Sequence, residues 1–208
     1  MKHQFYFKKV PHLSVLDPLI ISWRKTLTAP QDGMWETITN HAVHFEIRHN
    51  NETIGYAVVN DQNQLLQLFI EEDWQQLAGN AFEELIKEQQ ISEALVGTNN
   101  PVFHNILQLA QKATAVHTLL FTDVAVVATQ SITTPIRLAW QEDLATLVDF
   151  YHDSTGAPSE WLTHYLSDLI SKGELFFLAD VTGIMGACEV RMSDTNPKVA
   201  DIGMVVGN

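Results

Sequence analysis

The sequence is poor in cysteine and in positive charge. A single cysteine, Cys188, among 208 residues excludes an internal disulfide framework and favours a reducing compartment. Lys and Arg together number 12 against 25 Asp and Glu, which gives a formal net charge of −13. Because phosphate contacts require clustered basic side chains, this balance argues against nucleic acid and against anionic membrane surfaces as partners.

The sequence also shows neither a secretory signal nor a membrane-spanning segment. The N-terminus lacks the long apolar core of a signal peptide, and apolar runs such as residues 175–179 are far too short to cross a bilayer. With 46% hydrophobic residues, the chain can still bury a substantial core, as one large domain or two small ones. We therefore expect a soluble cytoplasmic protein.

Hydrophobic periodicity predicts a complete set of strands and helices before residue 128. Alternating or continuous apolar residues predict strands at 4–10, 43–48, 52–60, 64–70, 94–96 and 116–127. Three-and-four spacing predicts helices at 14–26, 73–89 and 101–112. Residues 128–135 are polar, Thr-rich and aperiodic, which places a domain boundary there.

The same order of elements begins again after this boundary. Residues 136–139 are predicted as a strand, 143–152 and 159–171 as helices, 175–180 and 184–192 as a hairpin, and 199–206 as a last strand. Ile54-Gly55 and Met185-Gly186 occupy equivalent positions, at the entrance to the second strand of each hairpin. Because helices precede both hairpins and a third strand follows both, the chain is interpreted as a tandem repeat.

In this arrangement the chain resembles the GNAT superfamily of acetyl-CoA-dependent N-acetyltransferases. The family has a strand, one or two helices, an antiparallel meander, and then a phosphate-binding loop that opens a helix. The resemblance implies an α/β (α+β) fold with two GNAT-like domains, whose mixed, largely antiparallel sheets are flanked by helices. Residues 1–128 would form one domain, 129–134 a linker, and 135–208 the N-terminal half of a second domain.

The resemblance also implies acetyl-CoA as a cosubstrate, and a small-molecule or peptide amine as the acceptor. It places pairing with the amide-rich pantetheine arm on the strand backbone of Met204, Val205 and Val206. The alternative is that these three residues only pack in an apolar core.

The first domain has a degenerate phosphate-binding segment at residues 75–80. Gln75 fits the first position of the motif, but Ala78 and Asn80 occupy its two glycine positions. Three acidic residues, 71–73, stand directly before the helix, where they favour the helix dipole but repel a pyrophosphate. We interpret this domain as a non-binding copy with a structural or substrate-shaping role.

Asp201 and Glu189 are the candidate catalytic bases. In some members of the family, a carboxylate at the start of the strand before the phosphate loop takes the proton. Asp201 lies near that place and Glu189 lies on the neighbouring strand. In a regular strand, Asp201, Gly203 and Val205 share one face. The alternative is that Asp201 only solvates an edge strand, and Glu189 only the open face of a sheet.

Other candidate side chains point to no further chemistry. His41 and His44 are three residues apart in a probable strand, so they face opposite ways and make a poor metal pair; no metal is predicted. Cys188 is interpreted as a small apolar strand residue. Five aromatic residues surround the two helices of the second half and are interpreted mainly as core: Trp140, Phe150, Tyr151, Trp161 and Tyr165.

The phosphate loop of the second domain would follow Asn208, where the sequence stops. We therefore expect chemistry in the second domain, incomplete in this chain, which alone should bind acetyl-CoA poorly. Residues 135–208 should be less stable than 1–128, or be completed by a partner copy in a homo-oligomer. The alternatives are a non-catalytic GNAT-like binding or regulatory module, and a structural α+β protein unrelated to CoA.

Overall fold

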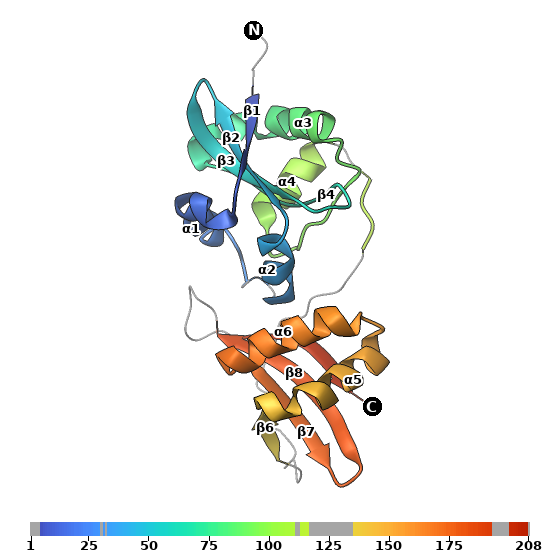
Figure 1. The fold of residues 1–208 in the computed structure, drawn as a ribbon. Coiled ribbons are helices and arrows are strands. Elements are labelled where there is room, and N and C mark those ends of the chain that lie inside the picture. The colour runs from blue at the N-terminus through green and yellow to red at the C-terminus, as the bar shows by residue number, and fades with distance from the viewer. Residues whose placement is uncertain are drawn as a thin grey trace. The chain divides into compact units, whose positions relative to one another are not determined.

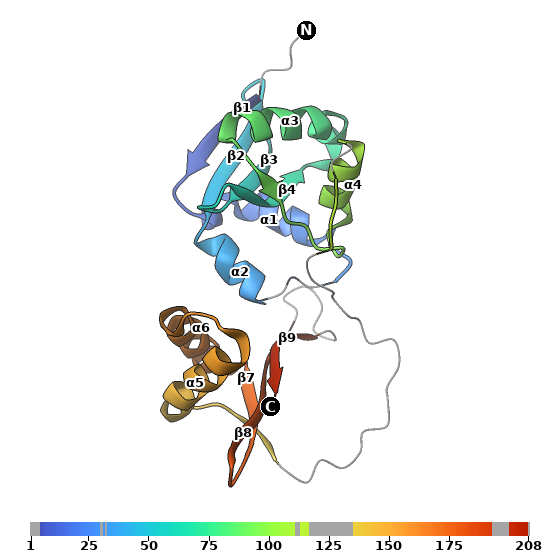
Figure 2. The ribbon, with the colours of Figure 1, turned by 90° about the vertical axis from the view of Figure 1, so that its right-hand side faces the viewer.

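The protein divides into two compact units. The computed structural model describes residues 5–29, 31, 33–110, 113–116, 135–192 and 200–207 (Figure 1). The first unit comprises Met1–Gln31 and Trp35–Phe121, and the second comprises Asp32–Met34 and Thr122–Asn208. In the described residues each unit contains one sheet (Figure 2). The predicted linker, 129–134, and most of the predicted strand 116–127 lie outside the described residues.

The first unit has a five-stranded sheet in the order β1-β2-β3-β4-β5. The strands β1 to β4 pair in antiparallel fashion, and β5 pairs with β4 in parallel. Its elements, including the 3-10 turns η1 and η2, are β1 (Phe5–Val10), η1 (Leu13–Leu16), α1 (Asp17–Arg24), α2 (Gly33–Asn40, assigned to this unit from Trp35 onward), β2 (Val43–His49), β3 (Glu52–Val59), β4 (Gln64–Ile70), η2 (Glu72–Leu77), α3 (Ala78–Gln89), β5 (Glu93–Ala94) and α4 (Pro101–Leu109).

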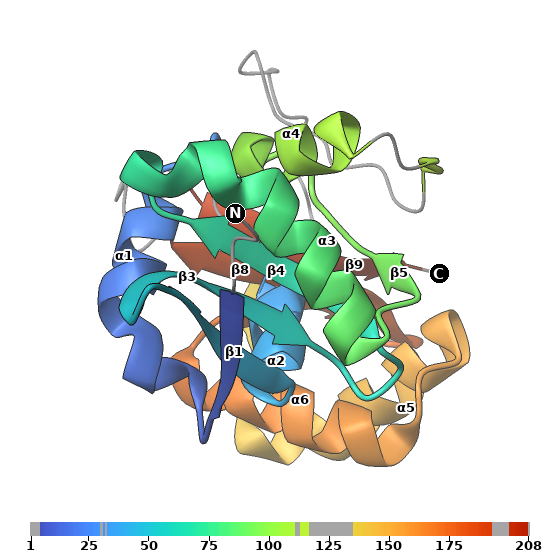
Figure 3. The same ribbon diagram turned by 90° about the horizontal axis from the view of Figure 1, so that it is seen from above.

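Helices cover both faces of this first sheet. On one face, Leu19, Ile20 and Trp23 of α1 pack against residues such as Tyr56 and Phe69. On the other face, the apolar residues of α3 and α4 pack with a separate set of strand residues (Figure 3). Because both faces are covered, β3 and β4 are buried almost throughout instead of alternating between buried and exposed positions.

The second unit has a four-stranded antiparallel sheet in the order β6-β7-β8-β9. Helices α5 and α6 lie together on one side of it (Figure 2). The predicted hairpin and last strand are confirmed. Its elements are β6 (Ile136–Leu138), the 3-10 turn η3 (Gln141–Asp143), α5 (Leu144–Thr155), α6 (Ser159–Lys172), β7 (Leu175–Asp180), β8 (Gly183–Met192) and β9 (Ala200–Gly207).

The face of the second sheet away from α5 and α6 carries exposed apolar side chains. Met192 is 55% exposed, Ile202 61% and Val205 69%. In the register of β8 with β9, Met192 and Ile202 belong to the face opposite that of Glu189. Among the described residues, no helix packs on this face.

The two hairpins have the same irregularity at the same place. In the first, Ile47 pairs with Gly55 and Arg48 with Thr53, so Ile54 is an extra residue of β3. In the second, Leu178 pairs with Gly186 and Ala179 with Ile184, so Met185 is an extra residue of β8. The predicted equivalence of these two dipeptides therefore agrees with the register of both sheets.

A close approach of the next strand explains the glycine in the first hairpin. A Cβ atom on Gly55 would lie 2.0 Å from the carbonyl oxygen of Phe69. A Cβ atom on Gly186 would lie 3.3 Å from the carbonyl oxygen of Val206, which holds the corresponding place on β9. Glycine is thus obligatory in the first hairpin and only favoured in the second.

No helix within the described part of the chain is both long and apolar enough to cross a membrane.

Candidate functional site

The last strand of the second unit contains a β-bulge. Ala187 pairs with Val206 and Glu189 with Gly203, so Met204 and Val205 together stand opposite the single residue Cys188. Met204 has φ +46, a left-handed conformation that is uncommon for a residue with a side chain. Such conformations persist only where the surroundings impose them.

The bulge overturns one prediction. In a regular strand, Asp201, Gly203 and Val205 would share a face, but the extra residue reverses the alternation after Gly203. Val205 is consequently 69% exposed, whereas Met204 and Val206 pack against the core under α5 and α6. The sequence pattern of this strand gives no sign of the extra residue.

A tyrosine of α5 binds the bulge directly. The hydroxyl of Tyr151 donates a hydrogen bond to the carbonyl oxygen of Met204 at 3.0 Å, and the Tyr151 side chain is fully buried. Burial raises the pKa of Tyr151 well above its ordinary value, and the neighbouring Cys188 and Glu189 raise it further. The hydroxyl therefore stays protonated and acts as a donor at any physiological pH.

Glu189 is fully buried on the helix-covered face, so the prediction that it may only solvate an open face is wrong. The hydroxyl of Tyr165 donates a hydrogen bond to its Oε2 atom at 2.5 Å. Leu175 and Gly203 are its partners on the neighbouring strands. A carboxyl group in such a place requires polar partners, because burying it without them is costly.

Asp201 lies on the same face of the sheet, directly opposite Arg191 on β8. Asp201 is partly exposed, unlike Glu189. The structure thus brings the two predicted bases to one face of adjacent strands, in different environments.

The aromatic residues of α5 and α6 form much of the covering layer. Tyr151 and Tyr165 are buried, as predicted for core residues, and the ring of Trp161 stacks on Tyr165 with centroids 4.9 Å apart. Trp140, in contrast, is 60% exposed. Burial raises the pKa of the Cys188 thiol, which suits an unreactive strand residue.

The fourth strand of the first unit is also bulged, close to the place that corresponds to the bulge of β9. Val58 pairs with Gln67 and Val59 with Leu65, so β4 has Leu66 as an extra residue. Counted from the pairs Gly55–Ile70 and Gly186–Gly207, Gln67 corresponds to Met204. β5 continues alongside β4 only at Gln64 and Leu65.

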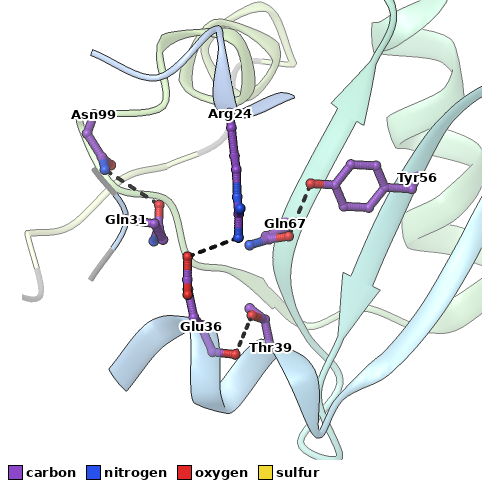
Figure 4. Close-up of polar contacts among 7 residues, drawn as sticks. All are labelled: Arg24, Gln31, Glu36, Thr39, Tyr56, Gln67 and Asn99. Atoms are coloured by element: carbon purple, nitrogen blue, oxygen red, sulfur yellow. Dashed lines mark hydrogen bonds and ion pairs between the residues drawn. The ribbon is translucent and has the colours of Figure 1, made fainter. Parts of the chain in front are cut away.

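Polar side chains gather around the bulge of β4, and Figure 4 shows seven of them. The hydroxyl of Tyr56 donates to Oε1 of the buried Gln67 at 3.3 Å. Arg24, at the end of α1, reaches Oε1 of Glu36 on α2 at 3.4 Å. Burial raises the pKa of Tyr56, against a smaller opposite effect from Arg24.

Two further contacts complete this polar cluster. Thr39 donates from Oγ1 to the backbone carbonyl of Glu36 at 2.9 Å, and Asn99 donates from Nδ2 to Oε1 of Gln31 at 3.5 Å (Figure 4). The sequence does not predict this cluster, because its members come from separate elements of the unit. The one available signal was Gln67, a polar residue between the apolar pairs Leu65-Leu66 and Leu68-Phe69 of β4.

The segment aligned with a phosphate loop is not a glycine-rich loop. Residues 75–77 belong to η2 and 78–80 to the first turn of α3, so the predicted helix from residue 73 begins as a 3-10 turn. The amide of Gln75 donates to the carbonyl oxygen of Ile70, at the end of β4. This side chain therefore binds the last backbone carbonyl of β4.

The described residues hold no group of three or more His, Cys, Asp or Glu side chains suited to a metal ion. His44, one of the two histidines considered, has its Nε2 atom 2.8 Å from the carbonyl oxygen of Thr39.

Comparison with known proteins identifies the fold and the family. A family model described as an acetyltransferase (GNAT) domain matches residues 12–124. An acetyltransferase of the GNAT family from Colwellia psychrerythraea is 26% identical with a TM-score of 0.76, and the alignment covers 98% of this chain and 78% of that one. No relative is found among curated proteins.

A tandem GNAT protein from the clavulanic acid biosynthesis pathway, solved without AcCoA, is 15% identical with a TM-score of 0.53. The alignment covers 99% of this chain and 79% of that one, and shows a likeness of fold alone. The family match, in contrast, extends over more than half of the sequence, from residue 12 to residue 124. On that ground, the chain belongs to the GNAT acetyltransferase family.

Proposed function

We propose that the protein is an N-acetyltransferase that uses acetyl-CoA as the acyl donor, in which residues 1–128 form one GNAT-like domain and residues 135–208 correspond to the N-terminal half of a second. The repeated hairpin irregularity at Gly55 and Gly186 supports the tandem interpretation, as do the bulges in β4 and β9. The acceptor would be an amine, on a small molecule or a peptide.

The bulged strand β9 is the observation that carries this proposal. Among the described strands, β9 is at the edge of its sheet, and Met204 and Val205 share one partner on β8. An edge strand can bind an amide-rich ligand through its backbone, as in strand addition. Met204, Val205 and Val206 would therefore hold the pantetheine arm, and bound acetyl-CoA would supply a thioester carbonyl open to attack by an amine.

Asp201 is the residue we propose as the base. An aliphatic amine is protonated near neutral pH, so a group at the site must take its proton. Asp201 is partly exposed, whereas Glu189 is fully buried and bound by Tyr165. Asp201 is thus the more exposed of the two carboxylates, and Glu189 is kept as the alternate base.

The first domain is proposed to be the copy that does not bind the donor. The place of Met204 is taken there by Gln67, whose side chain is bound by Tyr56. Gln75 is likewise bound to the end of β4, and acidic residues begin the following turn. A structural or substrate-shaping role fits these contacts.

The test is acetyl-CoA turnover by the full chain with a panel of amines, for wild type, Asp201→Asn and the matched exposed variant Asp153→Asn on α5. Loss of a general base predicts a fall in kcat of about 100-fold or more for D201N and no change for D153N. A loss in Glu189→Gln alone would transfer the role to Glu189.

A non-catalytic GNAT-like module is the second candidate. Two observations favour a non-catalytic module. Glu189 is fully buried, and the side chain of Gln75 is already bound to the carbonyl oxygen of Ile70. Calorimetric binding of CoA without acetylation of any amine would support this candidate and contradict the enzyme.

A further inference from the structure

We propose that Tyr151 is a positioning residue, which holds the bulge of β9 in the one conformation that the acyl donor can bind. This inference rests on the proposed donor site at Met204–Val206. It assigns a role in that site to α5, which contributes none of the proposed binding or catalytic residues.

The conformation of Met204 needs an external support. At φ +46 the side chain crowds its own backbone, and a methionine adopts this region far less readily than glycine does. The support observed is the hydrogen bond from the hydroxyl of Tyr151 to the carbonyl oxygen of Met204, 3.0 Å long. Regular pairing with β8 does not provide this support, because Met204 and Val205 share the single opposite residue Cys188.

Fixing this carbonyl also fixes the next amide. In a planar trans peptide, the carbonyl of Met204 and the N–H of Val205 point in opposite directions. Because Tyr151 holds the carbonyl toward α5, the N–H of Val205 is directed away from that helix. The tyrosine thus sets the direction of a hydrogen-bond donor on the strand proposed to bind the donor molecule.

The bond also fixes the place of the extra residue. If the bulge moved by one residue along β9, the side chains it passed would change faces. With a shift toward Val206, Val205 would turn from solvent toward the core, and Met204, now partly buried, would turn outward. One hydroxyl therefore selects both the direction of an amide and the face of the residues beside it.

The decisive variant is Tyr151→Phe in the full chain, which removes the hydroxyl and keeps the ring in the core. We expect amide hydrogen exchange at Val205 and Val206 to accelerate about threefold to tenfold relative to the amides of β7, as for the loss of one hydrogen bond. Affinity for acetyl-CoA, measured by calorimetry, should fall by a similar factor.

Two further variants separate positioning from general destabilisation. Ser154→Ala removes another hydroxyl from α5, one that donates to the carbonyl oxygen of Phe150, and should leave the amides of β9 unchanged. In the double variant Y151F/M204G, glycine adopts the left-handed conformation without penalty. It should restore most of the affinity that Y151F loses.

The outcomes distinguish this inference from the proposed function. Altered exchange at β9 in Y151F, in a protein that binds no acetyl-CoA, supports the positioning role and contradicts the donor site. Unchanged exchange and unchanged affinity in Y151F would overturn the inference while the donor site stands. Failure of M204G to restore affinity would also count against it.

Discussion

The strands β4 and β9 share a backbone irregularity but differ in what occupies it. In β4 the bulge is buried, and the side chain of Gln67 accepts a hydrogen bond from Tyr56 on the adjacent strand. In β9 the backbone carbonyl of Met204 receives the hydrogen bond of a tyrosine on a helix. A β-bulge can therefore be part of a core, as in β4, or lie on an edge strand, as in β9, depending on the side chains around it.

The residues beside the two bulges also differ, in the size and polarity of their side chains. By register, Tyr56, Val58 and Leu66 of the first unit correspond to Ala187, Glu189 and Gly203 of the second. Large apolar or aromatic side chains are thus replaced by small residues and one carboxyl group. The side chains beside the bulge of β4 are therefore bulkier than most of those beside the bulge of β9.

The largest expected difference concerns the two hairpin glycines. Gly55→Ala forces a Cβ atom against the backbone oxygen of Phe69 and should destabilise the first unit by about 3 kcal/mol. Gly186→Ala, where the corresponding oxygen is 3.3 Å away, should change the stability of the second unit by less than about 1 kcal/mol. Hydrogen exchange resolved by unit measures both, and equal effects would contradict the packing argument.

A smaller effect is expected from the two tyrosine hydroxyls that bind side chains. Tyr165→Phe removes a donor from the buried carboxyl of Glu189 and should destabilise the second unit by about 2 kcal/mol. Tyr56→Phe removes a donor from the neutral amide of Gln67 and should destabilise the first unit by about 1 kcal/mol. Chemical denaturation followed by unit-resolved exchange gives both values.

The double variant Y165F/E189L provides the control for that comparison. Replacing both partners with apolar groups should recover most of the stability lost in Y165F, because no polar group is then left buried without a partner. If Y165F and the double variant were equally unstable, packing of the ring, and not the hydrogen bond, would be the cause.

The smallest expected effect is a difference in acid sensitivity between helix starts. Arg137 lowers the pKa of Asp143 from its ordinary value, mainly through a hydrogen bond, and Asp143 also accepts from the backbone N–H of Trp140. A depressed folded pKa stabilises the folded state above the unfolded pKa, and this contribution is lost as pH falls through the folded pKa.

The N-cap residue of helix α1 in the first unit, Leu16, forms no side-chain cap. Asp143→Asn should therefore flatten the acid dependence of the second unit's stability and leave that of the first unit unchanged. Thermal denaturation between pH 2 and pH 6, about the range over which a carboxylate titrates, measures it. A change in both units would contradict the assignment.

The sequence predicted the meanders well and the site only in part. Alternation and turn residues located both hairpins, and the dipeptides ending in Gly55 and Gly186 were correctly predicted to occupy equivalent positions, although the extra residue at each was not predicted. The bulge of β9 was not predictable, because Met-Val-Val is apolar at every position and does not reveal which residue is extra. Without it, the wrong face was expected for Val205.

Other differences have similarly local causes. Helix α2 was missed because its residues, Gly33–Asn40, form only two turns, which is too short for periodicity to identify a helix. Burial of Glu189 could not be expected, since a charged residue on a strand ordinarily faces water and its partner Tyr165 is 24 residues away. The polar cluster around Gln67 depends on contacts between distant parts of the first unit.

The bulge has a consequence for chain length. Because β9 contains one residue more than its pairing with β8 requires, deletion of Val205 would leave a strand that can pair regularly through Met204 and Cys188. Residues on either side would keep their present partners and faces. A one-residue deletion, ordinarily among the most disruptive changes within a strand, would here straighten it, and would give a folded protein from which the proposed donor site alone has been removed.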